Sequence, residues 1–232
     1  MRKQLLFVTD SLGLPRFLPE RVAGHQVWVN LVARSFEGQV DPYFYTVAGL
    51  HTSDLVSSLD VQLGGFDADI VVLQVGIVDC APKALGENER KAVLRLPDPL
   101  RRMIHGFLRR NYARVVQWRD LTYVPETRFK ENLVRFRAHF KGCRFVVVPI
   151  APADQGYRKK NPLIDRNIRN YNRLIESVFP EAFAREAFEG ADPDSLFASD
   201  HHHLSIPGHA AVARAVVARV RAALAAGPGA EG

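Results

Sequence analysis

The sequence of 232 residues has little cysteine and no long apolar segment. Its two cysteines, Cys80 and Cys143, cannot form a disulfide framework, and they cannot complete a zinc site without help from histidine. No run of about 18 apolar residues occurs, so we expect no membrane-spanning helix. An internal repeat and a linker rich in Gly, Ser or Pro are also missing. The sequence therefore predicts a single domain over residues 1–226 and a flexible C-terminal tail over 227–232.

The first residues lack the pattern of a secretory signal. The apolar run that follows Met1-Arg2-Lys3-Gln4 is too short for the core of a signal peptide, and no small-residue cleavage site follows it. We therefore expect a cytoplasmic protein.

Basic residues outnumber acidic ones by 31 to 25, which gives a net charge of +6. Many of the arginines and lysines fall in two segments, 101–119 and 158–173. These segments are interpreted either as solvated helix faces or as a surface for an anionic partner, such as a phosphorylated metabolite, coenzyme A, an acidic glycan or a membrane surface. No nucleic-acid-binding motif accompanies them, so no nucleic-acid partner is expected.

Strand and helix patterns alternate along the chain. The predicted strands are Gln4–Val8, Tyr43–Val47, Asp69–Val75 and Arg144–Ile150, with a weaker one at Ala182–Phe188. The predicted helices are Pro19–Phe36, Ser53–Leu59 (with Thr52 or Ser53 as N-cap), Pro99–Tyr112, Glu126–Phe140, Pro162–Phe179 and Ile206–Ala226. This alternation predicts a three-layer α/β/α sandwich, in which helices cover both faces of a mainly parallel sheet.

Ligands of such sheets bind at the carboxyl ends of the strands, and chemically useful residues occur there. Ser11 follows the first strand, Gly49 the second and Asp79 the third. Asp200 and His203, before the last helix, are three residues apart, so the carboxylate can hold one ring nitrogen of the histidine while the other faces outward. A serine, a histidine base and an orienting carboxylate are the elements of nucleophilic catalysis.

These segments resemble the sequence blocks of the SGNH hydrolases, the GDSL-type esterases and lipases. Thr9-Asp10-Ser11 stands where the family has Gly-Asp-Ser, and Asp200-His201-His202-His203 matches its Asp-x-x-His block. Gly76-Ile77-Val78-Asp79 matches Gly-x-Asn-Asp, except that Val78 replaces the asparagine. Gly49 is the best candidate for the remaining block. The resemblance covers nearly the whole chain and implies a flavodoxin-like sheet of five strands.

The resemblance also implies roles for individual residues. Ser11 would be the nucleophile, His203 the base and Asp200 its orienting partner. The backbone N–H groups of Ser11 and Gly49 would form the oxyanion hole. The family's third donor is the asparagine side chain, which Val78 cannot supply, and loss of such a donor costs about 100- to 1,000-fold in rate.

Three charged residues near these blocks are candidates for substrate binding: Asp10, Arg16 and Asp79. Arg16, just after the predicted nucleophile, is interpreted either as a surface charge or as a clamp for a carboxylate or phosphate. The run His201-His202-His203 could suggest a metal, but adjacent histidines of an extended loop point in different directions, and no second ligand cluster is visible. We therefore predict neither a metal nor another cofactor.

The leading functional hypothesis is a serine-dependent esterase or deacylase that forms an acyl-enzyme. Its substrate would be a small-molecule or glycan ester, with an anionic ester among the alternatives. A second hypothesis is an acyltransferase of the same fold, which passes the acyl group to an alcohol in glycan biosynthesis. A third hypothesis is a non-catalytic binding protein that keeps the fold. Its basis is Val78, which stands where the family has the asparagine of the oxyanion hole. The sequence does not indicate an oligomeric state.

Overall fold

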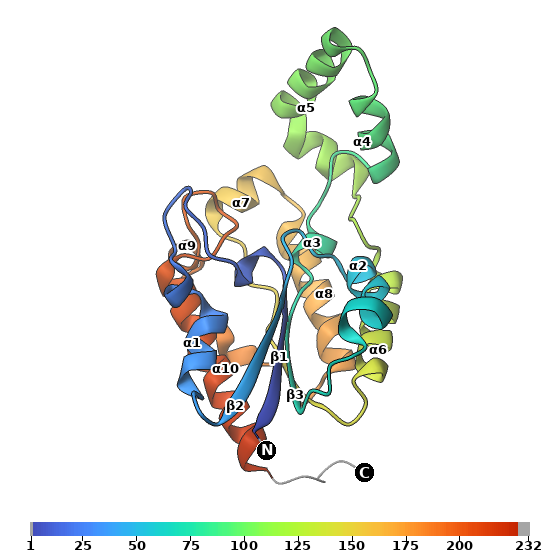
Figure 1. Cartoon of the computed structure of the whole chain (residues 1–232). Helices are drawn as coiled ribbons and strands as arrows, with labels where there is room; N and C mark the ends of the chain where they lie inside the picture. The colour runs from blue at the N-terminus through green and yellow to red at the C-terminus, as the bar shows by residue number, and fades with distance from the viewer. Residues whose placement is uncertain (1, 227–232) are drawn as a thin grey trace.

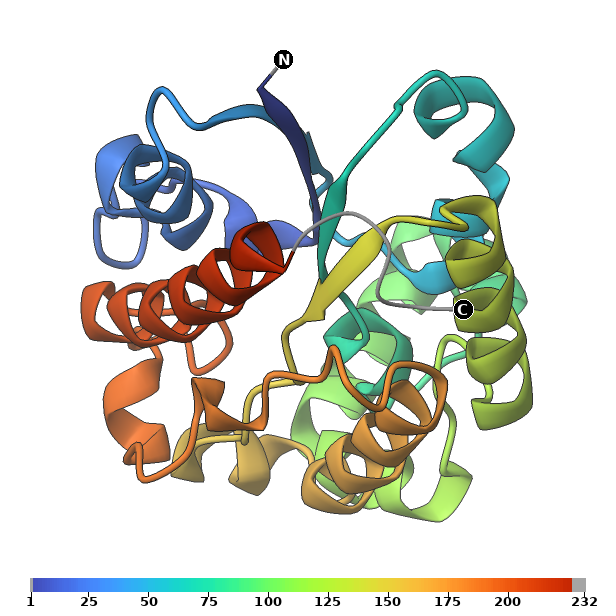
Figure 2. The ribbon, with the colours of Figure 1, turned by 90° about the horizontal axis from the view of Figure 1, so that it is seen from below.

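The computed structural model of the chain describes residues 2–226 and contains a parallel sheet between two layers of helices (Figures 1 and 2). The strands are β1 (Lys3–Thr9), β2 (Val40–Thr46), β3 (Ile70–Gln74) and β4 (Arg144–Val147), in the order β2-β1-β3-β4. Every neighbouring pair is parallel. The predicted α/β class and the mainly parallel sheet are therefore confirmed.

The helices cover both faces of the sheet. They are α1 (Trp28–Ser35), α2 (Thr52–Ser57), α3 (Ile77–Cys80), α4 (Glu87–Leu94), α5 (Asp98–Arg119), α6 (Glu126–His139), α7 (Gln155–Lys160), α8 (Ile164–Val178), α9 (Pro193–Leu196) and α10 (Ile206–Ala225). Figure 2 shows α1 and α10 on one face and α6 and α8 on the other. Among residues 2–226, no helix has both the length and the apolar character needed to cross a bilayer.

The core consists of two apolar clusters, one on each face of the sheet. Along β1, Leu5 and Phe7 pack in the cluster with α1 and α10, whereas Leu6 and Val8 pack in the cluster with α6 and α8. All four side chains are fully buried. Burial on both faces requires apolar residues at successive positions, which is why the sequence predicts the central strands well.

The predicted fifth strand at Ala182–Phe188 does not form, so the sheet has four strands in the described chain. Val147 of β4 exchanges backbone hydrogen bonds with Ala182 and Ala184, which makes one parallel bridge to Phe183. The N–H of Ala187 then bonds back to the carbonyl of Ala184, and the chain enters a 3₁₀ turn. That turn ends the pairing after a single bridge.

The predicted helix Pro19–Phe36 is wrong in its first half, because α1 begins only at Trp28. Arg16 and Val22 form an antiparallel bridge through two backbone hydrogen bonds, and Gly24–Gln26 is a separate 3₁₀ turn. These local bonds use the backbone groups that a longer helix would need. The sequence also misses α3, α4, α7 and α9. The cap of α2 is His51 rather than Thr52 or Ser53, since its Nδ1 accepts from the N–H of Asp54 at 3.3 Å.

Two expectations about the chain ends and domains stay open. The predicted tail at 227–232 lies outside the described residues. A single domain over 1–226 stays a prediction.

His209 of α10 contacts α1 in the same helical layer. From its burial we predict that the free energy of unfolding depends on pH. Its side chain on α10 is 1% exposed, and its Nδ1 accepts from the N–H of Trp28 at 3.3 Å. Burial, aided by the charge of Arg16, lowers the pKa of His209 to about 4 from 6.5. Between pH 6.5 and 4 the unfolded chain binds more protons at His209 than the folded chain does. The free energy of unfolding therefore decreases as the pH falls from about 6.5 through 4, by up to about 3 kcal/mol.

We expect His209→Asn to flatten this dependence, because asparagine offers an acceptor that does not titrate near these pH values. Urea unfolding of the native protein and of the variant, at several pH values between 7.5 and 4, measures the difference. The raised pKa of Asp10 makes its own contribution to stability change with pH in the opposite direction. That contribution is the same in both proteins, so it does not affect the difference between them. Parallel stability curves for the two proteins would contradict the assignment to His209.

Candidate active site

The loops at the carboxyl edge of the sheet border a cleft of about 490 Å³. Ser11 and Gly49 line it from the turns after β1 and β2, Val78 lines it from α3, which follows β3, and His202 lines it from the loop before α10. Polar and charged side chains also line the cleft: His51, Asp54, Lys83, Glu87, Arg90, Tyr123 and Tyr157. The structure thus brings residues from all four predicted blocks to one cleft.

A tight turn after β1 presents Ser11. The Oδ1 of Asp10 accepts from the N–H of Leu12 at 2.9 Å, and Ser11–Gly13 forms one 3₁₀ turn. Gly13 is required by close packing, since a Cβ atom at this position would lie 2.1 Å from the Thr9 Oγ1. Within residues 2–226 the Ser11 hydroxyl forms no hydrogen bond. The turn therefore leaves this hydroxyl available to a ligand.

Gly49 occupies the second position of the predicted oxyanion hole. Its φ of +72° lies in the left-handed region, which glycine adopts without strain. In the described part of the chain, neither the N–H of Gly49 nor that of Ser11 donates to a protein acceptor. Two backbone donors therefore border one cleft without an acceptor among residues 2–226.

A buried network joins α2, which begins just after Gly49, to α3, which contains Val78. The Oδ1 of Asp79 accepts from the backbone N–H of Thr52 at 2.8 Å and from its hydroxyl at 2.6 Å. Asn132 of α6 donates to the Thr52 Oγ1 at 3.1 Å. The network fixes two walls of the cleft relative to each other.

The predicted substrate ligands Asp10 and Asp79 are buried, with 1% and 0% exposure. Burial raises the pKa of Asp10 to about 7, against the lowering effect of its bond from Leu12, and the charge of Asp79 adds to the increase. Burial likewise raises the pKa of Asp79 to about 6, although the two bonds from Thr52 act in the other direction. Each carboxyl group accepts a hydrogen bond from a backbone N–H group, Asp10 from Leu12 and Asp79 from Thr52. Contact of either carboxyl group with the substrate stays a prediction.

Asp200 and His203 form the bond that their spacing predicts. The Nδ1 of His203 lies 2.7 Å from the Oδ2 of Asp200, and the backbone N–H of His203 donates to the Oδ1 of Asp200 at 3.0 Å. A bridge between Phe197 and Leu204 closes this loop. One carboxylate therefore holds both the ring and the backbone of His203.

Within the described chain, neither Asp200 nor His203 forms a hydrogen bond with Ser11. Of the three successive histidines, His202 is the one that lines the cleft with Ser11. The rings of His202 and His203 are 4.2 Å apart between centroids. The Nδ1 of His202 lies 2.9 Å from the carbonyl oxygen of Asp200, which is a backbone partner. The backbone N–H of His202 also donates to the Oδ1 of Asp200, at 3.2 Å, but of these two histidines only His203 has a ring nitrogen within hydrogen-bond distance of a carboxylate.

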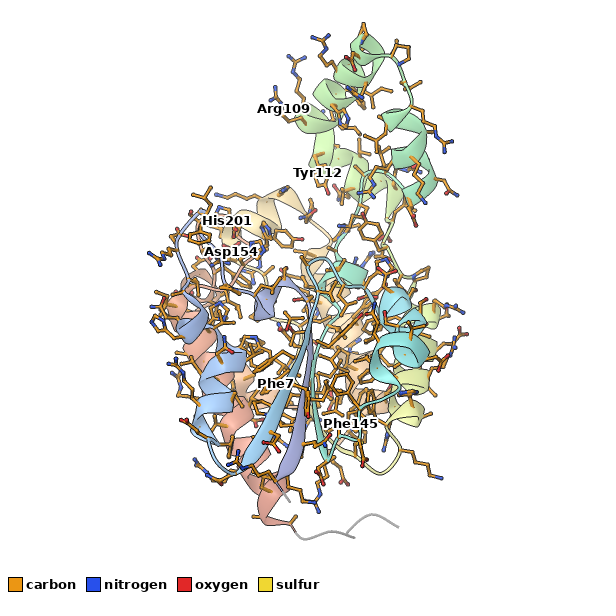
Figure 3. The ribbon with its side chains drawn as sticks, in the orientation of Figure 1. Phe7, Arg109, Tyr112, Phe145, Asp154 and His201 are labelled. Carbon is orange, nitrogen blue, oxygen red and sulfur yellow. The ribbon has the colours of Figure 1, made fainter. Side chains whose placement is uncertain are left out.

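His201 has a carboxylate partner that the sequence analysis missed. Its Nδ1 lies 2.7 Å from the Oδ2 of Asp154, and Figure 3 shows the two side chains close together near α7. Asp154 is buried and also caps α7 by accepting from the N–H of Tyr157 at 2.7 Å. Because Asp154 follows β4, the rule that directs attention to the carboxyl ends of strands could have found it.

Arg16 contacts the same histidine loop. Its guanidinium donates to the carbonyl of Leu204, and its Nε donates to the carbonyl of Glu20 at 3.4 Å. Burial lowers the pKa of Arg16, while the charges of Asp200 and Glu20 oppose that shift. Arg16 thus ties the turn after β1 to the residue that follows His203, and a role as a substrate clamp stays a prediction.

A metal ion has one geometrically suitable place in the described chain, where ligand atoms of Asp200, His202 and His203 lie within 4.8 Å of one another. The bond between Asp200 and His203 uses two of these ligands for each other. We predict that EDTA leaves ester hydrolysis unchanged, measured on an aryl acetate before and after dialysis. Activity that is lost in EDTA and restored by a divalent ion would instead indicate a metal site.

Comparison with known proteins gives similarity in structure but not in sequence. No protein-family model and no curated protein matches the sequence. Among solved structures, a lipase/acylhydrolase from Enterococcus faecalis is 17% identical, with a TM-score of 0.66 and 96% of each chain covered. TesA is 15% identical, with a TM-score of 0.60 over 95% of this chain and 99% of its own.

Axe2, an acetylxylan esterase from Geobacillus stearothermophilus, is 18% identical, with a TM-score of 0.60 and 94% of each chain covered. All three likenesses extend over nearly the full length of both chains. Together with the parallel sheet and its two helical layers, they show that the chain has the same α/β/α fold as these three proteins.

Proposed function

We propose that the chain is a serine ester hydrolase. The observation that carries this proposal is the cleft in which the Ser11 hydroxyl and the free N–H groups of Ser11 and Gly49 meet the loop of the Asp200–His203 pair. The shared fold with a lipase/acylhydrolase and an acetylxylan esterase supports it.

The proposed reaction has two steps. The Ser11 Oγ attacks the ester carbonyl while the Nε2 of His203 takes its proton, and the alcohol then leaves with that proton, which yields an acyl-enzyme. Water attacks the acyl-enzyme in the same way and releases the acid and free Ser11. Asp200 holds the Nδ1 of His203 and stabilises the imidazolium. The N–H groups of Ser11 and Gly49 stabilise the negative charge that develops on the carbonyl oxygen.

The lining of the cleft favours a polar ester. Beside Ser11 it presents His51, Lys83, Tyr123 and Tyr157 rather than a continuous aliphatic wall. Aromatic faces combined with hydrogen-bonding groups suit a sugar ring, and Axe2 is an esterase of an acetylated carbohydrate. We therefore place a glycan acetyl ester first among candidate substrates.

A fluorophosphonate probe with intact-protein mass spectrometry tests the mechanism. We expect one adduct, located on Ser11 by peptide mapping, and its absence after replacement of Ser11 or heat denaturation. An unlabelled native protein, or label on another serine, contradicts the proposal. Product analysis with an added alcohol then distinguishes hydrolysis from acyl transfer, because transfer yields a new ester.

Val78 allows a prediction about the missing oxyanion donor. It is half-buried and lines the cleft with Ser11, as the third block requires. We expect Val78→Asn to raise kcat on a short aryl ester roughly 10-fold or more, with a smaller change in KM, because this donor acts on charge that develops only in the transition state.

The opposite result has its own physical meaning. If the pocket around Val78 holds an apolar part of the substrate, the asparagine amide is buried without a partner, at a cost of about 1–3 kcal/mol. Both kcat and the melting temperature then fall, and the missing-donor explanation fails. Steady-state kinetics and a thermal melt of the same protein preparation separate the two results.

A further inference from the structure

The cleft beside Ser11 has charged side chains that the proposed reaction does not use. Its two carboxylates are already engaged: Asp54 with the Nε2 of His51 at 3.1 Å, and Glu87 with the Nζ of Lys91 at 2.5 Å. Lys83 and Arg90 line the same cleft, and neither forms an ion pair with any residue between 2 and 226. The cleft therefore contains two cations that the described residues do not neutralise.

Lys83 is held in place although no carboxylate of the described chain pairs with its charge. Its backbone N–H donates to the carbonyl of Leu121 at 2.8 Å, and its Nζ lies 4.4 Å from the ring centroid of Tyr123. The side chain is half-buried, and this burial lowers its pKa, with the positive charges of Arg90 and Lys160 acting in the same direction. A partly buried charge is normally paired, so an anion from solution would complete this site.

We propose that Lys83 and Arg90 form an anion subsite of the Ser11 cleft, and that the natural ester carries a carboxylate or phosphate group. This inference rests on the proposed function, because it names the substrate class of the same cleft. An arginine guanidinium can bind either anion through two parallel hydrogen bonds, and a lysine ammonium adds a point charge. The anion can lie on the alcohol side, as in an acidic glycan, or on the acyl side, as in a dicarboxylic half-ester.

Paired substrates distinguish the two sides. Acetylated methyl glucuronoside against acetylated methyl glucoside tests the alcohol side, and nitrophenyl hemisuccinate against nitrophenyl acetate tests the acyl side. We expect a higher kcat/KM for the anionic member of at least one pair. Lys83→Met and Arg90→Met should each lower that preference by roughly 10-fold or more, the usual value of a charge-assisted hydrogen bond. Arg95→Met, at the end of α4 and outside the cleft lining, is the matched control and should keep the preference.

A binding measurement separates failure of this subsite from failure of the proposed function. Inorganic pyrophosphate is titrated calorimetrically into the Ser11→Ala variant at constant ionic strength, with and without Lys83→Met. Binding that Lys83→Met weakens supports the subsite even if no ester is hydrolysed. Equal kcat/KM for both members of both pairs, or binding that Lys83→Met leaves unchanged, overturns it.

A second inference concerns the helical arm formed by α4 and α5, which projects from the rest of the chain in Figure 1. Five large apolar side chains of these two helices are strongly exposed: Leu94, Leu100, Met103 and Phe107, at 46–65%, and Trp118 near the end of α5, at 84%. Four arginines of α5 are exposed and have no ion-pair partner among the described residues: Arg102, Arg109, Arg110 and Arg114. Figure 3 shows the Arg109 side chain pointing away from the arm.

We infer that this arm binds an anionic lipid surface. Exposed apolar side chains beside unpaired arginines match the interface of such a membrane, where the chains insert below the headgroups and the arginines contact phosphate. A second copy of the arm fits worse, since its unpaired arginines would face arginines of the same sign. The observation is independent of the reaction at Ser11.

Vesicle co-sedimentation tests the arm. We expect binding to phosphatidylglycerol vesicles, weaker binding to phosphatidylcholine vesicles, and a decrease with added salt. Arg109→Gln combined with Arg110→Gln should weaken binding by roughly 30-fold, and Phe107→Ser should weaken it in both kinds of vesicle. Lys130→Gln combined with Arg135→Gln, two exposed positions of α6, is the control and should bind as the native protein does. Lack of binding to anionic vesicles, or self-association through Phe107 instead, overturns the inference.

Discussion

Replacing Ser11 by alanine should lower the hydrolysis of an aryl acetate by roughly 10⁴- to 10⁶-fold, because the variant lacks the attacking oxygen. The fold should be nearly unaffected. The Ser11 hydroxyl forms no hydrogen bond within residues 2–226, so its removal leaves no buried partner unsatisfied. Steady-state kinetics gives the first quantity, and a thermal melt gives the second.

Ser57→Ala is a suitable control for this experiment. Ser57 lies at the end of α2, exposed, and its hydroxyl donates only to a backbone carbonyl of its own helix at 2.9 Å. We expect native kinetics from that variant. If Ser11→Ala also keeps native kinetics, Ser11 is not the nucleophile, and the ester hydrolysis must be assigned to another group or to a contaminant.

The sheet and the site loops could be predicted from the sequence for one physical reason. Strands that helices cover on both faces consist of apolar residues in succession, as Leu5 to Val8 do, and such runs are visible without any long-range information. The carboxyl ends of these strands then locate Ser11, Gly49 and Val78, which line one cleft.

The contacts that could not be predicted join segments far apart in the chain. Asp154 and His201 are 47 residues apart and belong to different loops, so no local spacing indicates their bond. Long-range geometry of this kind appears only when the chain is folded.

The arm shows a second property that the sequence pattern does not predict, namely whether the apolar face of a helix is buried. The apolar spacing of Pro99–Tyr112 predicts a helix, and α5 confirms it, although α5 continues to Arg119. The same spacing would normally indicate a buried face, yet Met103 and Phe107 are 65% and 60% exposed. Periodicity reports that a helix has an apolar side, but not what covers that side.

The three successive histidines give the second large expected effect, because the structure holds two of them by different carboxylates. His203 is bonded to Asp200, and His201 to Asp154. We expect His203→Ala to lower kcat by roughly 10³- to 10⁵-fold, and His201→Ala and His202→Ala by less than about 10-fold. The reason is that only His203 has the three-residue spacing from Asp200 that the Asp-x-x-His block requires.

The two carboxylates provide the matched comparison. Asp200→Asn should lower kcat by roughly 10⁴-fold, because an amide cannot stabilise the imidazolium and favours the wrong tautomer of His203. Asp154→Asn keeps an acceptor for the N–H of Tyr157 and should mainly lower the melting temperature. If kcat instead falls with Asp154 and His201, the catalytic base is the other histidine of the loop. If it falls with His202 alone, the base is the histidine that lines the cleft, and Asp200 does not orient the base through His203.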